Sequence, residues 1–188
     1  AFANLSSQVD SVLANQNVGL STAMQDFFNA VQAVADDPTS IPARQVLLSE
    51  GEVLENRFNT LDNYLSDLTS QVNSGLQGNL QNINNIASGI AALNQQIVTT
   101  TSFGNGSLPN DLLDERDTLI DDLSKLVNVS TTTQENGAVN VFIGSGQSLV
   151  LDTTFYTLGT QQTGFDAGAV DIVIQQPAGN LVVTKFMT

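Results

Sequence analysis

The feature that most constrains the fold is a long stretch, from Pro42 to Ile97, in which apolar residues recur at helical spacing. These positions are Leu47, Leu54, Phe58, Leu61, Leu65, Leu68, Val72, Leu76, Ile83, Ile86, Ile90, Leu93 and Ile97. From Leu54 to Val72 the steps alternate between four and three residues, which is the spacing of a coiled-coil seam. One continuous helix here would be roughly 80–90 Å long at ~1.5 Å per residue. An ordinary catalytic domain needs no such rod, so the stretch indicates a structural role.

Two irregularities interrupt this stretch. The segment Val72–Leu76 adds a second step of four residues in succession, a stutter that locally unwinds a coiled-coil seam. The second half also contains the glycines Gly75, Gly78 and Gly89. Either the helix breaks near Gly75–Gly78, or the glycines permit close approach of a neighbouring segment. Because the stripe resumes over Ile83–Ile97, the sequence favours one continuous helix.

Two shorter helices are predicted before the long one. The first covers residues 4–14, and the second begins with Ser21 as its N-cap and ends before Pro38. Each has one apolar side, so we expect both to pack against the first half of the long helix. The expected centre of that core consists of Phe27, Phe28, Phe58 and Leu61.

After a loop predicted over residues 99–107, a further helix is expected over residues 111–127. Acidic residues occupy its first turns and Lys125 lies near its end, as the helix dipole favours. We expect this helix to run antiparallel to the long helix and to pair with its second half.

From residue 128 onward the hydrophobic pattern changes to the period of two that is typical of strands. The dipeptide Asn136–Gly137 separates two alternating segments, which predicts a β-hairpin. Further strands are expected at residues 147–151, 154–159, 169–176 and 181–187. The predicted fold class is α+β: an elongated antiparallel helical bundle around one very long helix, followed by a β-rich region. We expect a rod-like helical domain over residues 1–127, and over 128–188 a β-rich part of an outer domain that is truncated.

Composition excludes several classes of function. The formal net charge is −14 with only five basic residues, which disfavours phosphate-mediated nucleic-acid binding and anionic membrane surfaces. The chain has no Cys and no His, so disulfides, thiol chemistry, Cys/His zinc sites and imidazole catalysis are excluded. No apolar run approaches the ~20 residues that span a bilayer. We expect no cofactor, and the start at Ala1 rather than Met is typical of an excised piece.

Two local patterns could be taken for reactive sites. Asp114, Asp117 and Asp121 share one helix face, but helical carboxylates without loop carbonyls suit calcium poorly, so a solvated acidic face is the better interpretation. Gly144–Gly146 resembles a phosphate loop only superficially, since no helix with a Lys follows, and it is interpreted as a turn. The sequence therefore predicts no catalytic, cofactor-binding or metal-binding residues.

Two arginines stand out as candidate structural residues. Arg116 and Arg57 have no carboxylate three or four positions away on their helices, so neither can form an intrahelical ion pair. One interpretation is that each side chain extends over the apolar seam with its charge in water. The other is that Arg116 hydrogen-bonds backbone carbonyls or a carboxylate of another segment and thereby holds the last helix in place.

Several segments of the chain resemble the flagellar hook-associated protein 1 family (FlgK). They are residues 21–30 (STAMQDFFNA), residues 37–45, residues 109–117 (PNDLLDERD) with Leu123–Ser124 behind them, the hairpin, and residues 146–150 (GQSLV). The resemblance covers roughly residues 1–160 in order, and residues 110–117 are its most specific part.

The resemblance implies a structural, non-enzymatic subunit of the bacterial flagellum that joins hook to filament. Its implied partners are further copies of itself, the hook protein and the second hook–filament junction protein, with no nucleic acid and no membrane. It implies an extracellular location after type III export without a cleaved signal peptide. It also implies that this chain lacks the terminal regions that support polymerisation, so we expect a monomer in solution.

Two other classes of protein remain as alternatives. One is another secreted axial or type III helical protein, such as a flagellin, the second junction protein or a translocator. A flagellin would share the long helix but not the run at residues 110–117. The other is an enzyme or carbohydrate-binding module in the β-rich region, for which two Tyr, no Trp and no His offer few suitable groups.

Overall fold

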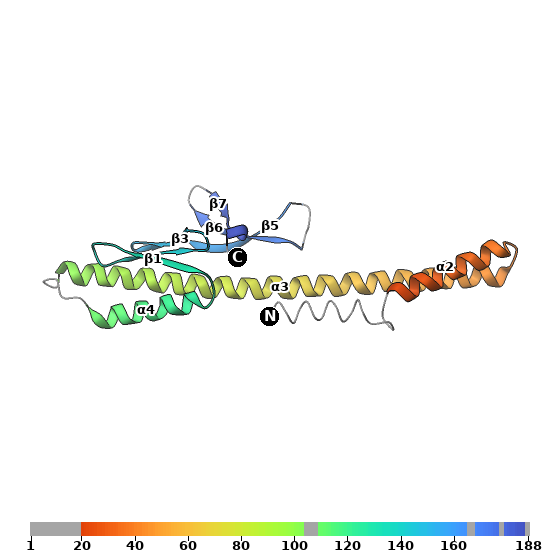
Figure 1. Cartoon of the computed structure of the whole chain (residues 1–188), viewed down its shortest axis with the longest axis horizontal. Helices are drawn as coiled ribbons and strands as arrows, with labels where there is room; N and C mark the ends of the chain where they lie inside the picture. The colour runs from red at the N-terminus through yellow and green to blue at the C-terminus, as the bar shows by residue number, and fades with distance from the viewer. Residues whose placement is uncertain (1–19, 104–108, 165–167, 177–178, 187–188) are drawn as a thin grey trace. The chain divides into compact units, whose positions relative to one another are not determined.

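The computed structural model describes residues 20–103, 109–164, 168–176 and 179–186. The chain forms two compact units, Ala1–Gln71 and Val72–Thr188. The described helices are α2 (Leu20–Asp36), α3 (Ile41–Phe103) and α4 (Asn110–Ser124), and they are labelled in Figure 1. The helix predicted at residues 4–14 lies outside the described residues. A helical region followed by antiparallel strands confirms the predicted fold class.

The helix α3 is a single uninterrupted helix of 63 residues. It passes through all three glycines, which confirms the expected continuity; no proline interrupts it after Pro42. Along the chain, the boundary between the two compact units falls between Gln71 and Val72, where the stutter begins.

The C-terminal part of α3 extends further than predicted, since residues 99–103 were expected in a loop. The hydroxyls of Thr99, Thr101 and Ser102 donate hydrogen bonds of 2.7 Å to the carbonyl four residues earlier. These bonds give the hydroxyl groups partners within the helix. The Thr and Ser side chains of this segment are thus accommodated within the helix.

The described part of the first unit is α2 with the first half of α3. Buried residues on α2 are Ala23 and Ala30, and an added Cβ at Gly51 of α3 would lie 3.8 Å from Cε2 of Phe27. The predicted aromatic core is wrong in part, because Phe28 is 61% exposed and Phe58 is 50% exposed. Phe27 and Leu61 are half-buried. The physical reason is that a pair of helices encloses little volume, so bulky residues beside the seam stay in contact with water.

The second unit contains two antiparallel sheets. The first has the order β1-β2-β3-β4, with bounds Val129–Thr133, Val139–Ile143, Gln147–Leu151 and Thr154–Phe155. The second has the order β5-β6-β7, with bounds Thr157–Gln162, Val170–Gln176 and Gly179–Val182. A 3-10 helix, η1, covers Thr184–Phe186, where the sequence had predicted a strand.

The β1–β2 hairpin closes through a three-residue turn. The Gln134 backbone N–H donates to the Ala138 carbonyl at 2.8 Å, and the Gly137 N–H donates to the Gln134 carbonyl at 3.1 Å. Gly137 has φ +88°, the left-handed conformation that glycine adopts without steric cost. The predicted hairpin at Asn136–Gly137 is therefore confirmed.

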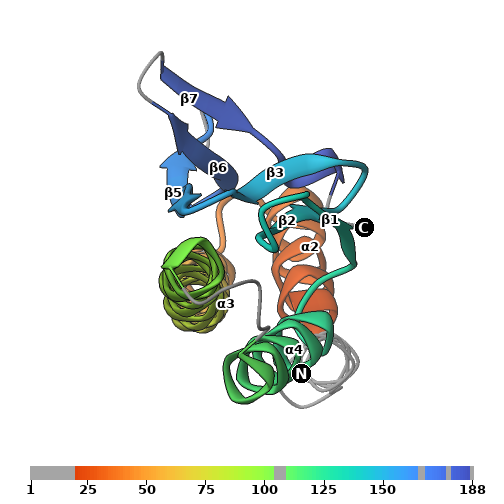
Figure 2. The same cartoon turned by 90° about the vertical axis from the view of Figure 1, so that its left-hand side faces the viewer.

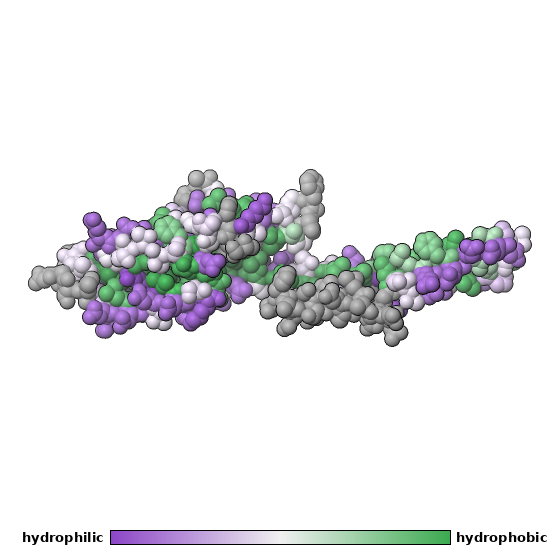
Figure 3. Space-filling view, in the orientation of Figure 1, coloured by the Kyte–Doolittle hydropathy of each residue, from purple (hydrophilic) through white to green (hydrophobic). Residues whose placement is uncertain are grey.

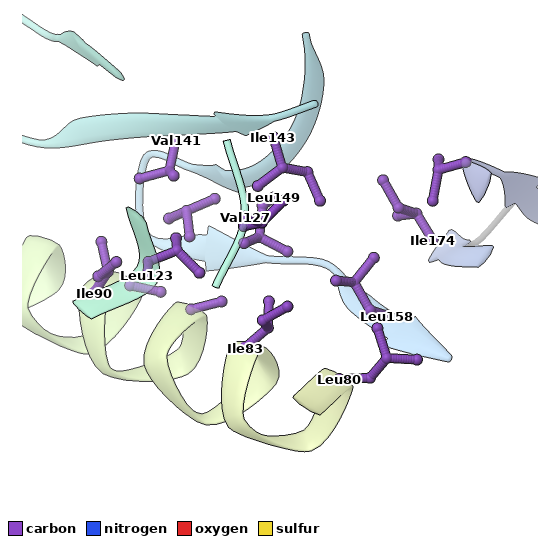
Figure 4. Close-up of a cluster of buried hydrophobic side chains, with 14 of the residues drawn as sticks. Leu80, Ile83, Ile90, Leu123, Val127, Val141, Ile143, Leu149, Leu158 and Ile174 are labelled. Carbon is purple, nitrogen blue, oxygen red and sulfur yellow. The ribbon is translucent and has the colours of Figure 1, made fainter. Parts of the chain in front are cut away.

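One hydrophobic core unites the second half of α3, α4 and both sheets. Its buried members include Ile83 and Ile90 of α3, Leu123 of α4, and residues from the strands, as Figure 4 shows. Figures 1 and 2 show that α4 and the strands approach α3 from different sides. An added Cβ at Gly89 would lie 2.9 Å from Cδ1 of Leu119, so this glycine permits the close approach of α4.

This shared core explains why the compact units divide at Gln71/Val72 rather than between residues 127 and 128. The strands bury their apolar faces against α3 and α4, so the change from helix to strand is not a break in packing. That the strands belong to an outer domain stays a prediction.

The core position of Leu123 generates a first prediction. Leu123 is fully buried, and its replacement by Ala leaves a cavity that typically costs about 2–5 kcal/mol. Leu123→Ala should therefore lower the urea midpoint of unfolding of the second unit. Leu126→Ala is the control, because Leu126 is 43% exposed and should lose less than ~1 kcal/mol. Equal midpoints for the two variants would contradict this packing.

Candidate functional site: a buried polar cluster on the long helix

Asn94 of α3 is fully buried and hydrogen-bonds to the backbone of two other segments. Its Nδ2 donates to the carbonyl of Val139 at 2.8 Å and to the carbonyl of Asp152 at 2.6 Å. Its Oδ1 accepts from the N–H of Val139 at 3.0 Å. The carboxamide thus pairs with both backbone groups of Val139, much as a neighbouring strand would. A helix side chain here supplies the hydrogen-bond partners that a neighbouring strand would otherwise supply.

Arg116 of α4 completes the cluster and is 6% exposed. Its Nη1 donates to the carbonyl of Gly137 at 2.8 Å and lies 3.4 Å from Oδ1 of Asn94. Its Nε lies 3.8 Å from a carboxylate oxygen of Asp117 and has no hydrogen-bond partner among the described residues. Desolvation by burial lowers the pKa of Arg116. The nearby charge of Asp117 partly opposes this effect on the pKa of Arg116. The guanidinium stays protonated, as it does in proteins generally. A buried positive charge therefore faces the backbone carbonyl of Gly137 and the amide oxygen of Asn94.

We name Asn94, Arg116, Gly137, Val139 and Asp152 the Asn94 cluster. It joins α3, α4, the β1–β2 hairpin and the turn between β3 and β4. The hydrogen bond from Arg116 to Gly137 corresponds to the second of the two arrangements that the sequence left open for this arginine. That the contact holds α4 in place stays a prediction.

A second asparagine of α3 repeats the arrangement. The Nδ2 of Asn84 donates to the carbonyl of Leu158 on β5 at 2.8 Å, and its Oδ1 accepts from the Leu158 N–H at 2.8 Å. Asn73 donates from Nδ2 to the carbonyl of Gly168 at 3.0 Å. The step of eleven residues from Asn73 to Asn84 returns to nearly the same face of the helix after three turns, whereas the step of ten from Asn84 to Asn94 falls about 80° short of three turns. The side chains of three asparagines of α3 thus donate hydrogen bonds to backbone carbonyls of the β-rich region.

Asp152 is held in an unusual backbone conformation within the cluster. It has φ +52°, in the left-handed region that Asp tolerates better than most residues. Its N–H donates to Oδ1 of Asn140 at 2.8 Å, and its own Oδ1 accepts from Nδ2 of Asn136 at 2.9 Å. The hairpin turn and the β3–β4 turn are therefore connected by side chains as well as by the sheet.

The other candidate residues lie outside this cluster. Arg57 is half-buried on α3 in the first unit and forms no hydrogen bond or ion pair with the residues that the structure describes. Phe27, Phe28, Phe58 and Leu61 also belong to the first unit. Asp114, Asp117 and Asp121 are all exposed on α4, and Gly144–Gly146 forms the turn between β2 and β3.

The described residues contain no group of three or more His, Cys, Asp or Glu side chains that could hold a metal ion. Among the described helices, none is both long enough and apolar enough to cross a bilayer.

Two open grooves lie in the second unit. One, of about 600 Å³, is lined by Gln134, Glu135, Asn136, Asn140, Leu151 and Asp152. Three of these six residues carry amide side chains and two carry carboxylates, so this groove offers hydrogen-bonding groups.

Sequence reasoning singled out Arg116 but missed the three asparagines. The signal for Arg116 was its lack of a local carboxylate, which implied a partner elsewhere in the chain. Asn84 and Asn94 carried no comparable signal, because polar amides are abundant in this sequence and the spacing alone identifies no partner.

Comparison with known proteins identifies the family. The family model described as the flagellar hook-associated protein FlgK helical domain matches residues 6–187. The chain belongs to this family. Members of the family are structural flagellar proteins, which agrees with the resemblance found in the sequence.

Several individual relatives agree with this assignment. Flagellar hook-associated protein 1 of Escherichia coli K12 is 36% identical over 180 residues, covering 95% of this chain and 33% of the relative. The protein of the same name from Bacillus subtilis 168 is 29% identical over 161 residues, covering 84% of this chain and 31% of its own length. The chain thus spans about a third of the length of these curated relatives.

A solved structure gives the same result for the fold. The flagellar hook junction protein FlgK from Burkholderia pseudomallei superposes with a TM-score of 0.75 at 32% sequence identity. The match covers 94% of this chain and 30% of that one. The fold of this chain is therefore similar to that of this solved FlgK protein.

Replacing members of the Asn94 cluster should destabilise the second unit. Asn94→Leu leaves both backbone groups of Val139 and the carbonyl of Asp152 without this partner, and each unpaired group costs about 1–3 kcal/mol. We expect a loss of roughly 3–5 kcal/mol in urea unfolding. Arg116→Met removes the bond to Gly137 and should cost about 1–3 kcal/mol.

The matched control is Asn79→Leu, which makes the same substitution at an exposed position of α3. It should change the free energy of unfolding by less than ~0.5 kcal/mol. If Asn94→Leu proved no worse than Asn79→Leu, the cluster would not contribute to stability.

Proposed function

We propose that this chain is part of a structural subunit of the bacterial flagellum that joins hook to filament by packing against other subunits. The observation that carries the proposal is the family match over residues 6–187. Relatives of this chain are named flagellar hook-associated protein 1, and the solved relative is described as a flagellar hook junction protein. Because the chain spans about a third of those relatives, the proposal concerns the role of the whole protein.

The surface of the first unit supports a packing role. Large apolar side chains that are at least 38% exposed on α2 and the first half of α3 are Met24, Phe28, Val31, Ile41, Val46, Leu48, Val53, Phe58 and Leu65. Figure 3 shows hydrophobic surface along these helices. Exposed apolar surface of this extent is typical of interaction sites.

We infer that the partners are further copies of this protein, the hook protein and the second hook–filament junction protein. The proposed location is the extracellular flagellum, reached by type III export without a cleaved signal peptide. A net charge of −14 disfavours nucleic acid and anionic membranes as partners. The proposed role is structural rather than enzymatic.

The apolar surface provides the test of this function. Phe58→Ser in the full-length protein should sharply reduce attached filaments and swimming when it replaces the native protein in the source bacterium. In the isolated chain the same change should cost less than ~1 kcal/mol, because half of the Phe58 side chain is already in water. Asn59→Ser is the control, since Asn59 is the neighbouring exposed residue and should leave filaments intact.

Two outcomes would oppose the proposal. Normal filaments with Phe58→Ser would show that this surface is not an assembly interface. A cysteine placed at position 58 of the cysteine-free chain should also form crosslinks between subunits in assembled flagella. An absence of crosslinks would likewise show that this surface is not an assembly interface.

We further infer that the chain by itself is monomeric. Detection of a stable oligomer by light scattering would contradict this inference.

A further inference from the structure

We propose that the Asn136–Gly137 turn is a self-modification site, at which Asn136 deamidates, and that the carboxylate of Asp152 restrains this reaction in the folded protein. Asn136 is exposed at the tip of the β1–β2 hairpin. Glycine follows it, and glycine offers the least steric hindrance to attack by its own backbone nitrogen. The only other reactant is water, and the product is an aspartyl or isoaspartyl residue.

The reaction requires no reagent other than water. The backbone nitrogen of Gly137 attacks Cγ of Asn136, and a five-membered succinimide ring forms as the bond from Cγ to Nδ2 breaks. Nδ2 leaves as ammonia and takes the proton that the Gly137 nitrogen loses. Water then adds to either ring carbonyl and opens the ring to Asp or isoAsp. One water is consumed and one ammonia is released, with no oxidation or reduction.

Three hydrogen bonds oppose this attack in the folded hairpin. The Gly137 N–H, which must lose its proton, donates to the Gln134 carbonyl at 3.1 Å. Oδ1 of Asn136 accepts from the Ala138 N–H at 3.0 Å, and Nδ2 donates to Oδ1 of Asp152 at 2.9 Å. The carboxamide must rotate out of these contacts before Gly137 can reach Cγ. Deamidation therefore proceeds through local opening of the turn.

Asp152 is the controlling residue because it supplies a restraint from outside the turn. The other two bonds lie within residues 134–138 and open together with the turn. Asp152 is held separately by its N–H bond to Asn140 and by the bond from Asn94 to its carbonyl. Its carboxylate thus ties the side chain of Asn136 to the Asn94 cluster.

Deamidation would in turn weaken the cluster. The new carboxylate would face the carboxylate of Asp152 across a contact of 2.9 Å in which no proton donor remains. An isoaspartyl linkage would also add an atom to the backbone directly before Gly137, whose carbonyl accepts the hydrogen bond from Arg116. The modification would therefore couple the hairpin tip to the buried arginine.

Two substitutions of Asp152 separate the carboxylate from the backbone conformation. Asp152→Gly removes the acceptor and tolerates φ +52°, whereas Asp152→Asn retains an acceptor oxygen and tolerates the left-handed region. The folded chains are incubated at mildly alkaline pH, and Asp and isoAsp at position 136 are quantified by peptide mass spectrometry. Asp152→Gly should deamidate about five-fold faster than the native sequence, the factor expected for loss of one hydrogen bond. Asp152→Asn should deamidate at a rate between those of the native sequence and Asp152→Gly, because its amide oxygen accepts a weaker hydrogen bond than the carboxylate does.

The native sequence unfolded in urea provides a measurement that does not depend on any variant folding. It should deamidate at Asn136 at least about ten-fold faster than the folded chain, because the turn no longer protects it. Equal rates in the folded and unfolded chains, or equal rates for the two Asp152 variants, would overturn the proposal. Asp121→Asn, at an exposed position of α4, is the control variant and should match the native rate. Peptides with Asn105–Gly106, which lies outside the described residues, are resolved separately.

Discussion

The pairing between asparagine side chains of α3 and strand backbone is the interaction on which the second unit depends. A strand end that meets the side of a helix leaves its N–H and C=O groups without the partners that another strand would supply. Asn94 gives both backbone groups of Val139 a partner, and Asn84 does the same for Leu158. Because buried polar groups must be paired, the apolar core beside them can close without an unpaired group at these two positions.

The length of α3 then sets the organisation of the chain. Its second half packs against both the strands and α4, and its first half belongs to the unit that contains α2. The stutter at Val72–Leu76 coincides with the change from one unit to the other. A helix whose seam shifts phase there presents different faces to different neighbours without being broken.

The two units differ in how completely they bury their large apolar side chains. In the second unit Leu80, Ile83 and Ile90 of α3 are buried, and the buried Arg116 donates to a backbone carbonyl. In the described part of the first unit, large side chains such as Phe28 and Phe58 stay in water. This contrast fits the proposed role, in which one region is a self-sufficient body and the other offers surface to further subunits.

The sequence by itself determined the elements that depend on local pattern. The continuous α3, the helix α4 and the hairpin at Asn136–Gly137 follow from spacing, dipole and turn chemistry over a few residues each. Tertiary structure alone decided the rest. Asn94 and Val139 are 45 positions apart, and no periodicity in either segment indicates that they meet. The exposure of Phe28 likewise depends on how much volume its neighbours enclose, which is a property of packed elements and not of a helix face.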